Sequence, residues 1–170
     1  MNMVISKEQG LGRTRNVLWW TLFIFFGILL QRLVPGVDFL VAGLLCILRE
    51  KRYKDLFWLL PLLVVLQEGM GTQAFGVALL WYAAASALFF LGRWLFDVDN
   101  FFYAFLLSAC LGICYFGIIF LMSPLYDVSL DVARLMDESV YQSLLLPPAW
   151  RLAQRTRRLA YTDDAAYEDN

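Results

Sequence analysis

The sequence contains no histidine, and charged residues make up only 17% of its 170 positions. Without an imidazole group, His-based catalytic triads, His-ligated zinc or haem sites and His proton relays are all excluded. Soluble domains carry about 25% charged residues, whereas this chain is 61% hydrophobic with a mean hydropathy of +0.61. The composition indicates a membrane protein and argues against a soluble enzyme or a basic nucleic-acid binder.

Residue types that would support other chemistry are also scarce. The three cysteines, Cys46, Cys110 and Cys114, all lie in apolar runs. Cys110 and Cys114 share a helix face, but no third or fourth ligand accompanies them, so we expect neither a metal site nor a disulfide framework. The chain has no glycine-rich phosphate loop and no paired-carboxylate site. We therefore predict a non-enzymatic protein without cofactor, metal or catalytic residue.

Long apolar windows are what the chain has in abundance. A helix needs about 20 apolar residues to cross a bilayer, and three windows reach that length while three are shorter. The shorter ones suit either buried or re-entrant segments or short helices within a bundle. Most of the six tryptophans fall near window ends, as interfacial aromatics do. In chain order the windows are 17–34, 37–48, 56–66, 74–92, 101–122 and 140–150.

The distribution of charge favours six crossings. With the N-terminus inside, twelve of the 14 basic residues fall on the inner side, and only Arg32 and Arg134 fall outside. The positive-inside rule predicts this bias. A hairpin over 37–66 entering from outside would instead place the charged residues 49–52 in the bilayer or outside, and burying them would cost several kcal/mol. We therefore expect an all-α integral membrane protein, a six-helix transmembrane bundle with both termini cytoplasmic.

The chain divides into three parts on this basis. Residues 1–16 form a cytoplasmic segment that leads into a retained anchor, because no small-x-small cleavage site follows the first apolar window. The transmembrane domain covers 17–153, and 154–170 form a cytoplasmic tail, basic and then acidic, which we expect to be disordered. A juxtamembrane patch suited to anionic headgroups is formed by Arg151, Arg155, Arg157 and Arg158.

Two outer segments carry the polar features of the chain. The loop 67–76 is glycine-rich and holds Glu68 at the membrane edge. It is either a tight extracytoplasmic turn or a broken helix end that lines a cavity or partner groove. The segment 123–139 has an apolar helical face and an acidic opposite side, so we expect an amphipathic helix docked on its own bundle or on another protein. The apolar face consists of Val128, Val132, Leu135 and Met136.

Small residues recur at helical spacing within two of the long windows. Ala104, Ser108 and Gly112 form one small-xxx-small stripe, and Ala83 with Ala87 forms another. Such stripes let helix backbones approach closely, which increases van der Waals contact inside a bilayer. Packing within the bundle is the default interpretation, and contact with a partner helix is the alternative.

The region from Glu68 to Leu79 resembles a motif of the MreD family of bacterial rod shape-determining proteins. That motif has an acidic residue, a glycine four positions later, and a second glycine eight positions later before a small-apolar pair. Here Glu68, Gly76 and the pair 78–79 match it, whereas Thr72 replaces the middle glycine and Gly71 lies one position early. Weaker similarities at Gln31 and at 151–155 extend the resemblance over roughly residues 17–159.

The resemblance implies a non-enzymatic scaffold subunit of the cell-wall elongation machinery in the bacterial inner membrane. Its partners would be a bitopic MreC-like protein and, indirectly, an actin-like filament and the wall synthases. The implied fold is similar to the six-helix substrate-binding component of energy-coupling-factor transporters. The candidate motif and partner-surface residues are Glu68, Gly71, Gly76, Ala104, Ser108 and Gly112.

Two further expectations follow. If Glu68 and Gly76 shape the outer end of the bundle, Gly76→Leu should disrupt helix packing there. The alternative function is a membrane component that binds a vitamin-like solute, although the polar groups needed to hold a ligand are sparse.

Overall fold

The computed structural model describes residues 2–70, 76–98, 100–126 and 131–165, and within these ranges every regular element is helical. The elements are α1 (Asn2–Leu33), α2 (Val41–Glu50), α3 (Tyr53–Gly69), α4 (Val77–Leu95), α5 (Phe101–Met122), the 3-10 helix η1 (Ser123–Tyr126) and α6 (Val132–Ala165). The prediction of an all-α fold is confirmed for the described residues, and each of the six apolar windows overlaps its own α-helix.

Three helices in the described part of the chain are long and apolar enough to cross a membrane. They are the Thr14–Leu33 part of α1, all of α4 and all of α5. α2 has only 10 residues, and at 1.5 Å per residue it extends about 15 Å, half of a hydrocarbon core about 30 Å thick. The described part of the chain is therefore all-helical with three membrane-spanning candidates, and α2 by itself is too short to cross.

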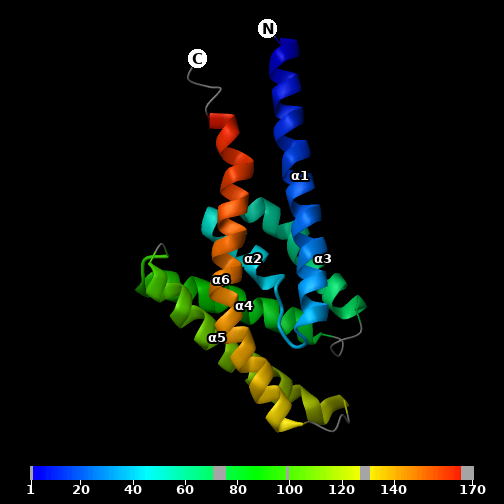
Figure 1. Cartoon of the computed structure of the whole chain (residues 1–170), viewed down its shortest axis with the longest axis vertical. Helices are drawn as coiled ribbons and strands as arrows, with labels where there is room; N and C mark the ends of the chain where they lie inside the picture. The colour runs from blue at the N-terminus through cyan, green and yellow to red at the C-terminus, as the bar shows by residue number, and fades with distance from the viewer. Residues whose placement is uncertain (1, 71–75, 99, 127–130, 166–170) are drawn as a thin grey trace.

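The short helix α2 forms the centre of the molecule. Every residue from Val41 to Leu48 is buried, and α2 packs against α3, α4 and α6 (Figure 1). A helix that is apolar on all sides is stable only when neighbouring helices surround it. The main contributions from those neighbours to the core are Leu59, Leu63, Ala78, Trp81, Ala85, Phe89, Leu146 and Trp150.

The remaining helices enclose this centre. α1 and α6 pack alongside each other, and both chain termini lie at the same end of the molecule, while α4 and α5 slant across them (Figure 1). Many large apolar side chains face outward, among them Val17 at 59% exposed, Phe26 at 57% and Ile113 at 73%. An exposed apolar surface of this extent is suited to lipid or to a protein partner rather than to water.

α6 merges three regions that the sequence suggested were separate. Its 34 residues take in part of the expected outer amphipathic helix, the last apolar window and the start of the tail, so the tail is helical as far as Ala165. Of the expected apolar face, Leu135 is 4% exposed, but Val132 and Met136 are 45% and 56% exposed. Val128 lies outside the described residues. Pro147 and Pro148 sit within α6, as membrane helices tolerate when neighbouring groups satisfy the freed carbonyls.

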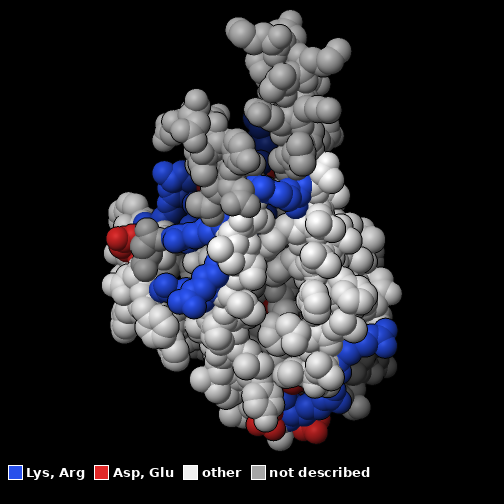
Figure 2. Space-filling model, turned by 45° about the horizontal axis from the view of Figure 1, so that its top comes forward, with Lys and Arg blue, Asp and Glu red and all other residues white. Residues whose placement is uncertain are grey.

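The charged side chains segregate by position on the surface. Figure 2 shows Lys and Arg gathered beside the terminal segments, a smaller group of mixed sign at the opposite end, and a broad uncharged surface on this face. Three of the six tryptophans belong to the core: Trp20, Trp81 and Trp150 are 3%, 1% and 2% exposed.

Candidate functional site

A buried carboxylate lies in the linker between α1 and α2. Asp38 falls inside the window 37–48, which we expected to be apolar, and it is only 2% exposed. Its carboxylate accepts hydrogen bonds from Gln31 Nε2 at 2.8 Å, Leu40 N at 2.8 Å and Trp81 Nε1 at 2.9 Å. Because a buried charge is stable only when it is well paired, these three donors explain how Asp38 is accommodated in the core.

The peptide group of Asp38 is held as firmly as its side chain. Gln142 on α6 accepts from Asp38 N at 2.7 Å and donates from Nε2 to Asp38 O at 3.3 Å. Gln31 Nε2 also donates to Gln67 Oε1 of α3, at 3.3 Å. We call Gln31, Asp38, Gln67, Trp81 and Gln142 the outer polar cluster. It ties α1, α3, α4 and α6 to the linker before α2.

A cavity of about 630 Å³ lies beside this cluster. Gln31, Asp38 and Gln67 contribute to its wall, together with Arg32 and Arg134. We call it the outer cavity. Arg32 and Arg134 are the two basic residues that the charge distribution predicts outside the membrane, a prediction that gives the cavity its name, and the structure brings them to one site.

The start of α6 closes over the linker at the rim of the outer cavity. Arg134 Nε donates to Glu138 Oε1 at 2.9 Å. The Glu138 side chain lies against Gly36, whose φ is +84°, so that a Cβ there would overlap it. The linker can adopt this turn because glycine readily takes a positive φ.

The structure brings Glu68 and Gly76 of the sequence motif together. Glu68 Oε1 accepts from Gly76 N at 2.7 Å, and Gly76 immediately precedes α4 with a φ of +85°. A carboxylate at a helix N-terminus satisfies an otherwise unpaired N–H and interacts favourably with the helix dipole. The motif thus links the ends of α3 and α4, while Gly71 and Thr72 lie outside the described residues.

The sequence predicts that Gly76→Leu disrupts helix packing, and the structure indicates backbone strain as a physical reason for such an effect. A Cβ at Gly76 would have no heavy atom of the described residues within 4 Å, so the first carbon of a side chain meets no clash with them. The positive φ is what disfavours a side chain there, by roughly 1–2 kcal/mol. The substitution is therefore expected to strain the turn before α4.

The stripe on α5 faces inward. Ala104 and Ser108 are 2% and 1% exposed. A Cβ at Gly112 would overlap Ser143 Oγ and lie 2.7 Å from Ser139 O, both on α6. These three residues thus pack within the chain, which agrees with the default interpretation of the stripe rather than with contact to a partner helix. The pair Ala83 and Ala87 on α4, in contrast, is exposed.

A second buried charge lies toward the end that carries the termini. Arg157 is 1% exposed, and its Nε donates to Glu50 Oε1 at 2.6 Å. Its guanidinium carbon lies 4.9 Å from the Trp19 ring centroid and 5.0 Å from that of Trp20. The prediction that Arg157 faces lipid headgroups is therefore wrong, because its charge is paired with Glu50 and stacked on two indoles.

Neither buried charge could be identified from local sequence. Asp38 is 43 positions from Trp81 and 104 from Gln142, and Arg157 is 107 positions from Glu50. The available signal was Asp38 itself, a carboxylate within an apolar window, which by general principle marks a paired or functional group. Within the described ranges, no group of three or more Cys, Asp and Glu side chains is arranged to hold a metal ion.

The chain was compared with known proteins after this geometry was established. No protein-family model matches it, and neither the curated proteins nor the solved structures return a match.

Proposed function

We propose that this protein is a non-catalytic scaffold subunit of the cell-shape and cell-wall elongation machinery, of the MreD type, in the bacterial inner membrane. The observation that carries the proposal is an open apolar groove between α1 and α6. The deeply buried Asp38 and Gln142 are engaged in hydrogen bonds that join the linker before α2 to α4 and α6. The groove, in contrast, is open and lined almost entirely by apolar side chains, which suits a partner that also lies in the membrane.

The groove has a volume of about 500 Å³. Its lining on α1 runs from Trp19 to Leu30, about 17 Å along the helix axis. We call it the α1/α6 groove. The only polar groups in its lining among the described residues are the hydroxyl of Thr156 and the indole N–H of Trp19. The full lining is Trp19, Leu22, Phe23, Phe26, Gly27, Leu30, Phe39, Ala42, Leu145, Pro148, Ala149, Leu152, Ala153 and Thr156.

A single transmembrane helix of a bitopic protein is the partner that fits this groove. Lipid offers no hydrophobic drive for helix association, so membrane helices associate through close packing at small residues. Among the small residues that line the groove, Ala149 is partly exposed and supplies such a position, whereas Gly27, Ala42 and Ala153 are buried at its base. An MreC-like protein has a single spanning helix, and through it the scaffold would reach the filament and the wall synthases.

The ends of the molecule support an orientation with cytoplasmic termini. Arg49, Lys51, Arg93 and Arg158 line one cavity, on the side of the molecule where Glu50 pairs with Arg157 of the C-terminal helix. Arg32 and Arg134 line the outer cavity. The positive-inside rule assigns the first group to the cytoplasm.

Depletion of the protein in its own bacterium tests the function. We expect rod-shaped cells to become round, and a plasmid copy of the wild-type gene to restore the rod shape. Cells that keep their shape and their rate of wall synthesis without the protein would contradict the proposal.

Two variants test the groove within the same experiment. Ala149→Phe fills the α1/α6 groove, whereas Ala87→Phe adds the same bulk at an exposed position on α4. We expect Ala87→Phe to restore rod shape and to co-purify with the MreC-like partner, and Ala149→Phe to fail in both. Equal partner recovery by the two variants would rule out this groove as the docking surface.

The outer cavity favours one other candidate function, the binding of a vitamin-like solute. Its volume of about 630 Å³ lies within the 300–1,000 Å³ typical of ligand sites. Amide, carboxylate and guanidinium groups converge on it. Purification in mild detergent followed by native mass spectrometry distinguishes the two functions: a tightly retained small molecule would favour solute binding over the scaffold.

A further inference from the structure

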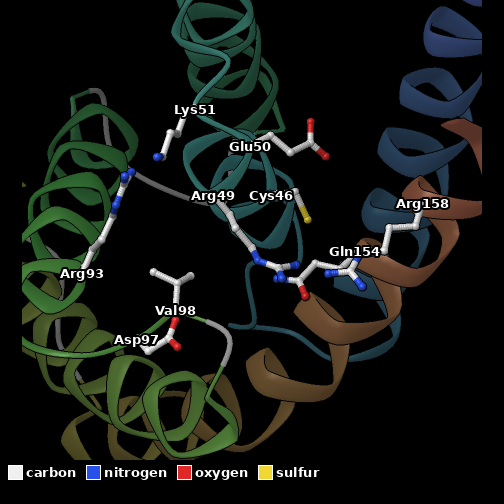
Figure 3. Close-up of a pocket in the computed structure, with 9 residues that line it drawn as sticks. All are labelled: Cys46, Arg49, Glu50, Lys51, Arg93, Asp97, Val98, Gln154 and Arg158. Atoms are coloured by element: carbon white, nitrogen blue, oxygen red, sulfur yellow. The ribbon is translucent and has the colours of Figure 1, made fainter. Parts of the chain in front are cut away.

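A third cavity, of about 510 Å³, lies where the α2–α3 turn, the end of α4 and the C-terminal half of α6 meet. We call it the inner cavity. Among the described residues, its charged lining consists of four basic side chains and two acidic ones (Figure 3): Arg49, Lys51, Arg93, Arg158, Glu50 and Asp97. Glu50 already binds a fifth base, Arg157, at 2.6 Å. The inner cavity therefore carries an excess of positive charge.

The basic side chains converge on the inner cavity from separate parts of the chain. In Figure 3 the ends of Lys51 and Arg93 point toward each other over the cavity, although they come from the α2–α3 turn and from α4. Arg49 and Arg158 approach from α2 and α6 near Gln154. Lys51 and Arg93 are like charges that converge from separate elements and repel each other, and an anion placed between them would reduce that repulsion.

The side chains that line the inner cavity are suited to binding a phosphate group. Guanidinium groups bind phosphate oxygens through paired N–H donors, and a lysine ammonium supplies a point charge. Gln154 adds an amide, and the buried Cys46 and the half-buried Val98 supply apolar contacts. Basic pockets between membrane helices at the cytoplasmic side hold phospholipid headgroups in the same way.

We propose that the inner cavity binds a phosphate group, carried by an anionic phospholipid headgroup or by free phosphate. This site is distinct from the α1/α6 groove and the outer cavity, and it does not depend on the identity of the scaffold's partner. Bases from three segments of the chain surround it, so an anion bound there would also hold α2, α4 and α6 together at this end.

Thermal unfolding of the full-length protein tests the site. The protein is measured in detergent with inorganic phosphate or with chloride at equal ionic strength. It is also measured in nanodiscs of phosphatidylcholine, with and without phosphatidylglycerol. We expect stabilisation by phosphatidylglycerol, by phosphate or by both. A response to phosphatidylglycerol alone assigns the site to a lipid headgroup, and a response to phosphate as well assigns it to any phosphate. No response beyond that of chloride and phosphatidylcholine would overturn the proposal.

A matched pair of double variants separates the inner cavity from general surface charge. Lys51→Gln with Arg93→Gln removes two lining bases, whereas Lys54→Gln with Arg155→Gln removes one lysine and one arginine from exposed positions outside the lining. We expect the first pair to weaken phosphate or lipid binding about tenfold or more, and the second to change it less than about threefold. Equal losses would mean diffuse attraction and would overturn the proposal.

A conservative variant keeps the result interpretable if the first pair is unstable. Lys51→Arg retains the positive charge at the same position, and we expect it to bind within about threefold of the wild-type protein. If Lys51→Arg folds normally but loses binding as completely as the double variant, the charge of the lining is not what holds the anion, and the proposal fails.

Discussion

The carboxylate of Asp38 occupies a position where an unpaired charge would be strongly destabilising. It is 2% exposed and accepts hydrogen bonds from three N–H groups. Two of these donors belong to α1 and α4, so the charge also fixes how those helices lie around α2. Hydrogen bonds to charged groups contribute about 1.5–3 kcal/mol each, and the outer polar cluster is therefore a strong determinant of the packing.

Replacing the indole donor tests this role. We expect Trp81→Phe to lower the unfolding free energy by about 1.5–3 kcal/mol more than Trp150→Phe does, measured by unfolding in mixed micelles. Both tryptophans are buried core residues of similar exposure. Trp150 Nε1 has no hydrogen-bond partner among the described residues, so its replacement removes ring volume alone. Equal destabilisation by the two variants would show that the bond to Asp38 contributes little.

The pair of Arg157 and Glu50 leads to a second prediction at the residue scale. Glu50→Gln leaves a guanidinium buried between two tryptophans without its carboxylate. We expect a loss of about 2 kcal/mol, less than the 3–5 kcal/mol of a fully buried pair, because Glu50 is 35% exposed and partly hydrated.

Glu138→Gln is the control for that measurement. It alters a pair with Arg134 whose arginine side chain is 69% exposed, and we expect a change of at most about 1 kcal/mol. Urea-induced unfolding of the two variants in detergent measures their losses of unfolding free energy. A larger loss for Glu138→Gln than for Glu50→Gln would contradict the conclusion that the Glu50–Arg157 pair is the more stabilising of the two.

At the scale of helices, α5 and α6 depend on a close approach at Gly112. We expect Gly112→Ala to destabilise the protein by about 1–3 kcal/mol, since its Cβ would overlap Ser143 and approach the backbone oxygen of Ser139. Gly117→Ala, on the same helix, places its Cβ in open space. It should be neutral or stabilising, because alanine favours helix by up to about 1 kcal/mol. Melting temperatures in detergent that rank the two variants the other way would refute this packing.

The junction of α3 and α4 supports a prediction about the sequence motif. Glu68→Ala removes the acceptor for Gly76 N, and we expect a loss of about 0.5–2 kcal/mol, as for other helix caps. Glu68→Gln keeps an acceptor oxygen and should lose less than about 1 kcal/mol. Hydrogen exchange at the start of α4 would report the fraying directly, and equal exchange in both variants would contradict a capping role.

At the scale of the whole molecule, the orientation in the membrane can be measured. A green fluorescent protein fused after Asn170 should fluoresce, because it folds in the cytoplasm, and alkaline phosphatase at the same point should be inactive. Fusions after Met70, which borders the outer cavity, should show the opposite pattern. Active phosphatase at the C-terminus would reverse the proposed orientation.

Much of the fold follows from local sequence, and much of the candidate site does not. Window 101–122 coincides with α5 because apolar length and freedom from charge are properties of a single segment. Hydropathy averaged over 37–48 conceals Asp38, however, and composition alone cannot show that Arg157 turns inward while Arg155 remains exposed. These outcomes depend on which groups from distant segments are available as partners.

The sequence by itself determined an all-helical fold for the described residues, the apolar part of each helix and the unequal distribution of its basic residues. Each of these is a local consequence of hydrophobicity, helix length and the exclusion of charge from lipid. Only the tertiary structure decided that Gly112 packs inward, that Asp38 is bonded to Trp81 and held by Gln142, and that four bases surround one cavity. Pairing and enclosure require residues more than 100 positions apart to meet, as Asp38 meets Gln142 and Glu50 meets Arg157, and that meeting is a property of the packed molecule.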